Sequence, residues 1–204
     1  MEDENSIVYR QRIETASFGI RLPGKGKTAL SLSHAIRINS NTTYQRELVQ
    51  LLWQGNAQFI GQTIEVAPTT NTYNWHEVDL GISRKFGPVR VGAKARYLMG
   101  VSALNTDANA RSLSVYTNPD IYQLQLTSNY GFYSAGLVSS IDTSGLGFDV
   151  TVDDLTSKIN KGSNGFAFDL GVSTHIGDKI MLYASALDLG ASIHWTETKY
   201  FKSN

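Results

Sequence analysis

In the stretch Val89-Arg90-Val91-Gly92-Ala93-Lys94-Ala95-Arg96-Tyr97-Leu98-Met99, every second residue from Val89 onward is apolar, and Arg90, Gly92, Lys94 and Arg96 fill alternate places. A period of two predicts a β-strand with one apolar face and one charged face. In a soluble sheet the charged face meets water, whereas in a membrane barrel the apolar face meets lipid and the charged face lines the lumen. The stretch is long enough to cross a bilayer, which takes roughly 9–11 tilted residues. Because the pattern returns along the chain, we favour the barrel.

The composition excludes several protein classes. The chain has 204 residues, 18 basic and 18 acidic, so its zero net charge gives no basic surface for nucleic acid and we expect no nucleic-acid partner. Its mean hydropathy of −0.20 and the absence of a long apolar run argue against membrane-spanning helices but are compatible with half-apolar barrel strands. Cysteine is absent, which removes disulfides and thiolate chemistry.

The amino-terminal residues Met1 to Asn5 are acidic and precede no apolar segment typical of a secretory signal peptide. An outer-membrane protein needs such a signal. We therefore expect either that the chain is an internal piece of a longer barrel or that the barrel interpretation is wrong.

The alternation predicts an all-β fold of about eight antiparallel strands. Tight turns at 23–26, 87–88, 129–131 and 177–178 alternate with long connections at 39–73, 101–120 and 141–164, an arrangement typical of an up-and-down transmembrane barrel. The alternative is a soluble antiparallel meander. The expected strands cover residues 13–22, 28–38, 74–86, 89–100, 121–128, 132–140, 165–176 and 179–189.

One short loop helix is predicted within residues 43–54. The apolar residues Tyr44, Leu48, Leu51 and Leu52 follow helical spacing, and Gly55 is a suitable carboxyl-terminal stop. This apolar stripe needs a partner surface. The helix is thus either a plug or lid inside the barrel mouth or a loop helix packed on the rim.

The tight turn at Gly87-Pro88 predicts how its two strands pair. If Phe86 lies opposite Val89, then Asp79 lies opposite Arg96, with Lys94 near Asp79 and Glu77 diagonal to Arg96. These charges either hold a narrow barrel together or select solutes along an aqueous path. The candidate lumen-lining residues are Glu77, Asp79, Arg90, Lys94 and Arg96.

No motif in the sequence predicts catalysis. Gly24 to Thr28 resembles the end of a phosphate-binding loop, but it lacks the upstream glycine and leads into a strand. The histidines His34, His76, His175 and His194 lack metal-ligand spacing. We expect no enzyme activity, no metal site and no cofactor.

Several motifs together resemble a family of uncharacterised outer-membrane β-barrels from Bacteroidota. They are Leu51 to Asn56 leading to Gly61-Gln62, Ala95 to Gly100, Asp120 to Leu124, Gly165 to Gly171, and Leu187 to Gly190 before Ile193-His194-Trp195. The resemblance implies a barrel distantly similar to those that pass hydrophobic molecules or serve secretion machinery. It supplies no catalytic or binding residues.

These observations predict an antiparallel up-and-down transmembrane β-barrel, or a large fragment of one, in the outer membrane of a Gram-negative bacterium. The predicted function is a non-enzymatic pore or hydrophobic-solute conduit. The alternatives are a scaffold subunit for surface-protein export or anchoring, and a soluble β-domain for ligand binding or adhesion. The expected partners are membrane lipid, a hydrophobic small molecule and an envelope protein.

Overall fold

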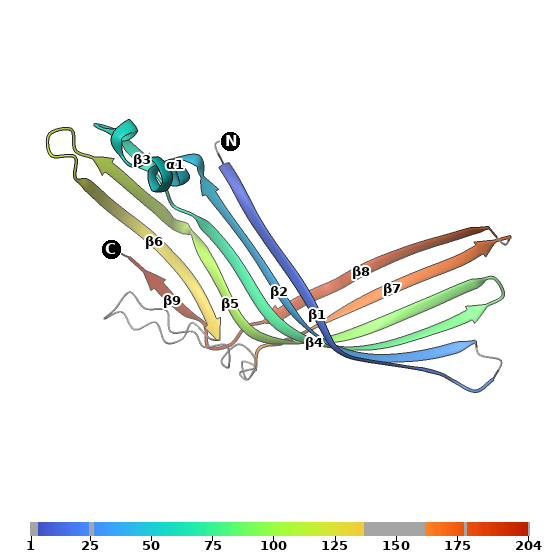
Figure 1. Cartoon of the computed structure of the whole chain (residues 1–204). Helices are drawn as coiled ribbons and strands as arrows, with labels where there is room; N and C mark the ends of the chain where they lie inside the picture. Colours follow the sequence, from blue (N-terminus) through green and yellow to red (C-terminus); the bar gives the residue numbers. More distant parts are fainter. Residues whose placement is uncertain (1–3, 25–26, 137–161, 178, 204) are drawn as a thin grey trace.

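A computed structural model describes residues 4–24, 27–136, 162–177 and 179–203 as one large antiparallel sheet with a short helix (Figure 1). In this part of the chain the elements are β1 (Glu4–Arg21), β2 (Thr28–Gln45), α1 (Arg46–Gln54), a 3₁₀ turn (Ala57–Phe59), β3 (Thr63–Glu65), β4 (Thr69–Phe86), β5 (Val89–Thr117), β6 (Leu124–Gly136), β7 (Asn164–Ile176), β8 (Ile180–His194) and β9 (Lys199–Lys202).

The sheet divides into two arms along the long strand β5. Strands β1, β2, β4 and β5 pair in that order through both arms, but the far edge of β5 changes partner along its length. Residues 89–99 pair with β7, which pairs with β8 to form the first arm. Residues 102–117 pair with β6, which pairs with β9 in the second arm.

The change of partner coincides with a bulge at Val101. The neighbouring residues Gly100 and Ser102 pair with consecutive residues of β4, so Val101 is an extra residue in the ladder. Gly136 ends β6 beside it with φ +77°, and a Cβ there would lie 2.0 Å from the Val101 carbonyl oxygen. Only glycine fits this close approach, so the bulge and Gly136 together allow the two arms to diverge (Figure 1).

The prediction of an all-β antiparallel fold with one helix is confirmed, but closure into a barrel is not. In the first arm, β1 and β8 are the two edges, and neither pairs with the other within the described residues. No helix of the described part is long and apolar enough to cross a membrane.

Most expected strands are present, and the tight turn at Gly87-Pro88 is confirmed. The turn predicted at 129–131 is wrong, because Asn129 and Tyr130 continue the β6 ladder and Gly131 instead makes room for the Tyr200 ring. The connection predicted at 101–120 is wrong too, because β5 continues through most of it to Thr117. Backbone hydrogen bonds to neighbouring strands hold this part of β5, although its side chains show no apolar alternation. Most of the predicted 141–164 connection lies outside the described residues.

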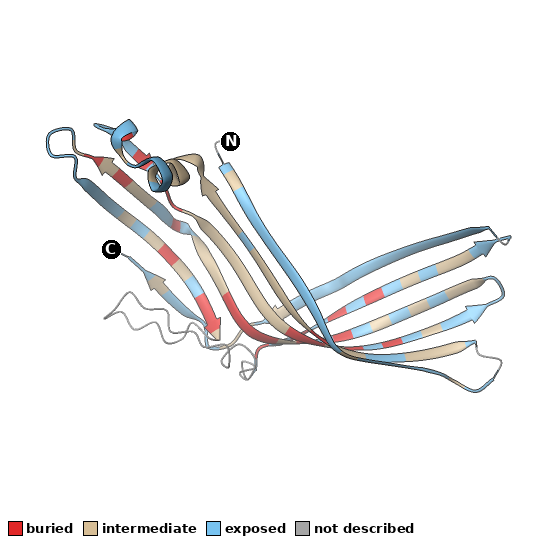
Figure 2. Cartoon of the chain, in the orientation of Figure 1, coloured by how far each residue is buried: buried red, intermediate tan, exposed pale blue. Residues whose placement is uncertain are grey.

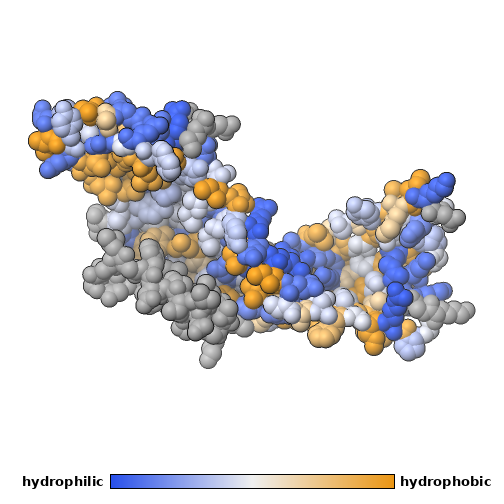
Figure 3. Space-filling model, in the orientation of Figure 1, coloured by the Kyte–Doolittle hydropathy of each residue, from blue (hydrophilic) through white to orange (hydrophobic). Residues whose placement is uncertain are grey.

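Buried and exposed residues alternate along strands of the first arm (Figure 2), but in the reverse of the usual pattern. Leu80 is 61% exposed and Phe168 54%, whereas Glu77 and Asp79 are 1% and 2% exposed. Apolar side chains therefore cover one open face of the arm, and charged side chains are buried against each other on the opposite face. Apolar residues reach the surface of both arms (Figure 3).

The second arm contains an ordinary apolar cluster. Phe59, Ile64, Val66 and Val115 are buried together where the 3₁₀ turn and β3 meet the end of β5. Leu48 and Leu51 of α1 pack against them. This cluster fixes the helix at the tip of the second arm.

Candidate functional site

The candidate site is the charged face of the first arm, which begins with the β4–β5 hairpin. Its predicted register is confirmed: Phe86 pairs with Val89, and Asp79 pairs with Arg96. Every second residue of a strand points to the same face, and directly paired residues share a face. This register therefore places Glu77, Asp79, Lys94 and Arg96 on one side of the sheet.

Asp79 lies at the centre of a group of positive charges. Its Oδ2 atom lies 3.4 Å from Lys94 Nζ and 3.4 Å from Arg12 Nη2, and Ser33 Oγ donates a hydrogen bond to it over 3.2 Å. Its Oδ1 atom lies 3.9 Å from Arg96 Nε. A buried carboxylate needs such partners, because an isolated charge is expensive to remove from water.

Glu77 lies diagonal to Arg96, as predicted, but forms its ion pairs with residues of other strands. Its Oε1 accepts a 2.8 Å hydrogen bond from Arg12 Nε, and its Oε2 lies 2.8 Å from Arg37 Nε. Arg12 comes from β1 and Arg37 from β2, whereas the diagonal neighbour Arg96 pairs with Asp79, Asp169 and Asp188 instead. The sequence did not predict these arginines, because the register of one hairpin does not determine which other strands lie beside it.

Arg96 extends the charged face toward the opposite edge. It donates hydrogen bonds to Asp169 of β7 and Asp188 of β8. The Asp188 N–H in turn donates to Asp169 Oδ1 over 2.9 Å. Asp188 has a left-handed φ of +56° within an irregular part of the β7–β8 ladder, and such irregularities re-aim side chains.

Together these eight residues form one continuous network, which we call the ion network. It joins four cations to four carboxylates across β1, β2, β4, β5, β7 and β8, and Arg12 also pairs over 3.0 Å with the exposed Glu14 at its margin. Its members are Arg12, Arg37, Glu77, Asp79, Lys94, Arg96, Asp169 and Asp188. Each buried carboxylate has a cation beside it, and removal of such a cation would leave an uncompensated buried charge.

The whole chain, residues 1–204, matches a family of unknown function, DUF5723. The chain belongs to this family. No curated protein and no solved structure matches it. For this DUF5723 chain the predicted membership of an uncharacterised family is thus confirmed, while the outer-membrane location and the bacterial group stay predictions.

A histidine pair that the sequence did not predict lies on the opposite face of the sheet from the ion network, because His34 pairs with Val78 and His76 with Ile36. His34 Nε2 is 3.1 Å from His76 Nδ1, and their rings are 5.2 Å apart. Thr15 on β1 contacts His34 Nδ1. The two histidines are 42 residues apart, so only the β2–β4 pairing brings them together. No group of three or more His, Asp or Glu side chains within the described ranges could hold a metal ion.

Arg90, the remaining predicted lumen-lining residue, stays apart from the ion network. Its Nη1 donates a 3.3 Å hydrogen bond to Ser83 Oγ, and no carboxylate of the described residues lies within ion-pair distance. It lies on the same face of β5 as Lys94 and Arg96 but nearer the tight turn. Arg90 is therefore a cation on this face without a matching negative charge.

The predicted plug or lid residues divide into two sets. Leu48 and Leu51 pack on the apolar cluster, but Leu52 and the adjacent Trp53 are 77% and 89% exposed. Leu52 lies about 100° around the helix from Leu51 and so points away from the cluster. Tyr44 belongs to β2 because the helix starts later than predicted, at Arg46, while the stop at Gly55 is confirmed by its N–H bond to the Leu51 carbonyl.

In the second arm, Asp107 ties β9 to β5. The Asn109 N–H and the Tyr200 hydroxyl each donate a 2.9 Å hydrogen bond to its carboxylate. These bonds, first that from Asn109, hold the pKa of Asp107 below its ordinary value, and the same contact raises the pKa of Tyr200. The pair lies in the second arm, apart from the ion network of the first arm, and holds β9 against β5.

Proposed function

We propose that this protein is a non-enzymatic transmembrane β-barrel of a Gram-negative outer membrane, with the first arm as the membrane-spanning wall. Its function is that of a pore for small water-soluble solutes. In this arrangement the apolar face meets lipid and the ion network lines the lumen.

The observation that carries the proposal is the reversed burial of the first arm. On β7, Phe166, Phe168 and Leu170 are exposed, while Ala167 and Asp169 between them are buried. A soluble sheet that exposed such a face would lose the free energy of burying it, about 25 cal/mol for each Å². Lipid contact on that face removes this cost, as in membrane barrels.

The length of the apolar band supports the same orientation. Residues 89–97 of β5 supply nine alternating positions, close to the roughly 9–11 that a tilted strand needs. Exposed Phe86 lies at the turn end, and the contacting rings of Tyr97 and Phe166 lie at the other. Aromatic residues at both ends of an apolar band are typical of membrane interfaces.

The charged face favours a pore over a conduit for hydrophobic molecules. Lys94, Arg96 and their carboxylate partners cross the face from edge to edge, and a hydrophobic solute passing them would have to displace favourable hydration or ion pairs. A small hydrophilic solute meets no such penalty.

Spin labels in lipid bilayers test the orientation. We expect a lipid-soluble quencher to reach labels at Leu80, Val91 and Ala93, which lie on the apolar face. It should not reach labels at Gly92 and Lys94, which lie on the charged face. Stronger quenching at Gly92 and Lys94 would reverse the faces, and equal weak quenching at all five would contradict a membrane wall.

Ion selectivity tests the pore. The reconstituted protein should conduct, and Lys94→Glu should shift its reversal potential toward cations because a fixed charge on the path changes sign. The conservative variant Lys94→Arg should leave the selectivity unchanged. Silent bilayers with correctly oriented protein would contradict conduction.

One observation favours the scaffold as a second candidate function. Leu52 and Trp53 are exposed side by side at the end of α1, at the tip of the second arm. Tryptophan is enriched among residues that dominate protein interfaces. Silent bilayers combined with specific binding of an envelope protein that Trp53→Ala abolishes would support the scaffold instead.

A further inference from the structure

We propose that the hollow on the charged face between Arg90 and Lys94 is a binding site for a small anionic solute that carries carboxylate or phosphate groups. The inference rests on the proposed function in one respect only, namely that this face is open to aqueous solute rather than covered by lipid. It adds the class of solute and the residues that recognise it.

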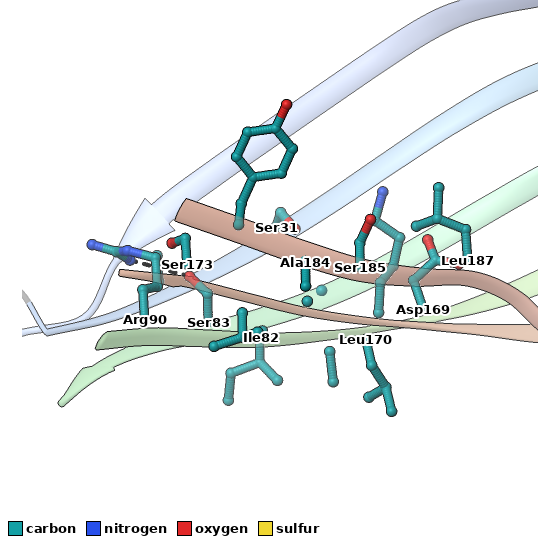
Figure 4. A pocket seen from close by; sticks show the side chains of 18 of the residues that line it. Ser31, Ile82, Ser83, Arg90, Asp169, Leu170, Ser173, Ala184, Ser185 and Leu187 are labelled. Carbon is teal, nitrogen blue, oxygen red and sulfur yellow. Dashed lines mark hydrogen bonds between the residues drawn. The ribbon is translucent and has the colours of Figure 1, made fainter. Parts of the chain in front are cut away.

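The hollow has a volume of about 490 Å³ and lies on the turn side of the ion network. Its size falls within the range of ordinary small-molecule sites. The polar residues Ser173, Ser185 and Asp169 rise from one side of the strands in Figure 4, whereas Ile82 and Leu170 point to the other side. The site is therefore built on the charged face and not on the apolar one.

The sheet register explains why there is room. One row of directly paired residues crosses five strands and contains only small side chains: Ala29, Ser83, Gly92, Gly171 and Ser185. The next row, on the side of the ion network, contains Lys94 and Asp169. Large charged side chains thus form one wall of the hollow, and the small row leaves the space beside it.

The charges around the hollow favour an anion. Both oxygens of Asp169 already accept a hydrogen bond, one from Arg96 and one from the Asp188 N–H, and Arg96 offsets part of its negative charge. Arg90 at the opposite wall has only the Ser83 hydroxyl as partner among the described residues.

Lys94 adds a second positive charge. It lies 3.4 Å from Asp79, a carboxylate that other cations also surround. Along one strand, Arg90 and Lys94 are separated by four residues, or about 13 Å. A solute with negative groups at both ends could contact both cations, and the serine hydroxyls between them would donate hydrogen bonds to it.

Titration calorimetry of the full chain in detergent micelles tests the site with three probes of different charge. We expect citrate, a multivalent carboxylate, to bind, while neutral trehalose and cationic spermidine do not. Arg90→Gln should weaken citrate binding roughly tenfold or more, the loss expected for one charge-assisted contact. Arg84→Gln is the matched control, because Arg84 lies on the opposite face of the sheet from Arg90 and sits over the Phe86 ring.

A second variant tests the volume without changing charge. Gly171→Leu should abolish citrate binding by filling the hollow, and a Cβ there meets its nearest atom only at 3.9 Å, so the strand should still form. Ala95→Leu, on the apolar face and outside the hollow, should leave binding unchanged. Circular dichroism of each variant confirms that the sheet is intact.

The outcomes separate this inference from the proposed function. No citrate binding, equal binding of trehalose, or equal losses in Arg84→Gln and Arg90→Gln would overturn the anion site, even if spin labels show the expected lipid contact. Citrate binding with the expected variant pattern would support the site, even if the same protein fails the lipid-quenching test.

Discussion

At the scale of single residues, Arg96 is the most buried cation of the ion network. Its side chain is 6% exposed and contacts Asp79, Asp169 and Asp188 on three strands. We predict that Arg96→Met lowers the free energy of unfolding by roughly 3–5 kcal/mol, because it leaves buried negative charges uncompensated. Urea titration of the protein in detergent micelles measures this loss.

Lys94→Met provides the residue-scale control. Lys94 is 35% exposed and Asp79 keeps its contacts with Arg12 and Ser33, so the expected loss is about 1 kcal/mol or less. Equal losses in the two variants would show that burial of Arg96 contributes nothing beyond an exposed ion pair.

At the scale of elements, α1 is held by one side of the helix only. We predict that Leu51→Asp detaches the helix from the cluster of Phe59, Ile64 and Val66, since a carboxylate there would be buried without a partner. Hydrogen exchange of residues 46–66 should then accelerate while β4 in the first arm keeps its protection. Leu52→Asp, one position away and exposed, should leave the hydrogen exchange of residues 46–66 and of β4 unchanged. Equal acceleration of residues 46–66 in the two variants would contradict this packing.

At the scale of the whole molecule, the edges β1 and β8 decide between a membrane wall and a soluble sheet. Unpaired N–H groups are too costly in hydrocarbon to persist, so a spanning wall must have paired edges. In lipid nanodiscs we predict that residues 13–20 of β1 and 180–187 of β8 exchange their amide hydrogens as slowly as β4. Fast exchange at both edges would support the soluble β-domain that the sequence left open.

The sequence by itself determined the local pairing and the faces of the first arm. Strict alternation over Val89 to Tyr97 and the tight turn at Gly87-Pro88 were enough to predict that Asp79 lies opposite Arg96, because a two-residue turn fixes the register of its strands. The helix and its stop at Gly55 were likewise local signals.

Only the tertiary structure decided which distant charges meet and where the sheet divides. Arg12, Arg37, Asp169 and Asp188 reach the β4–β5 hairpin through strand order, which local patterns do not encode. The second half of β5 lacks apolar alternation, so its sequence predicts a loop. It is nevertheless a strand, because β3, β4 and β6 form hydrogen bonds with its backbone groups. Side-chain periodicity separates the apolar face of a strand from its polar face, whereas backbone pairing between remote segments determines the architecture.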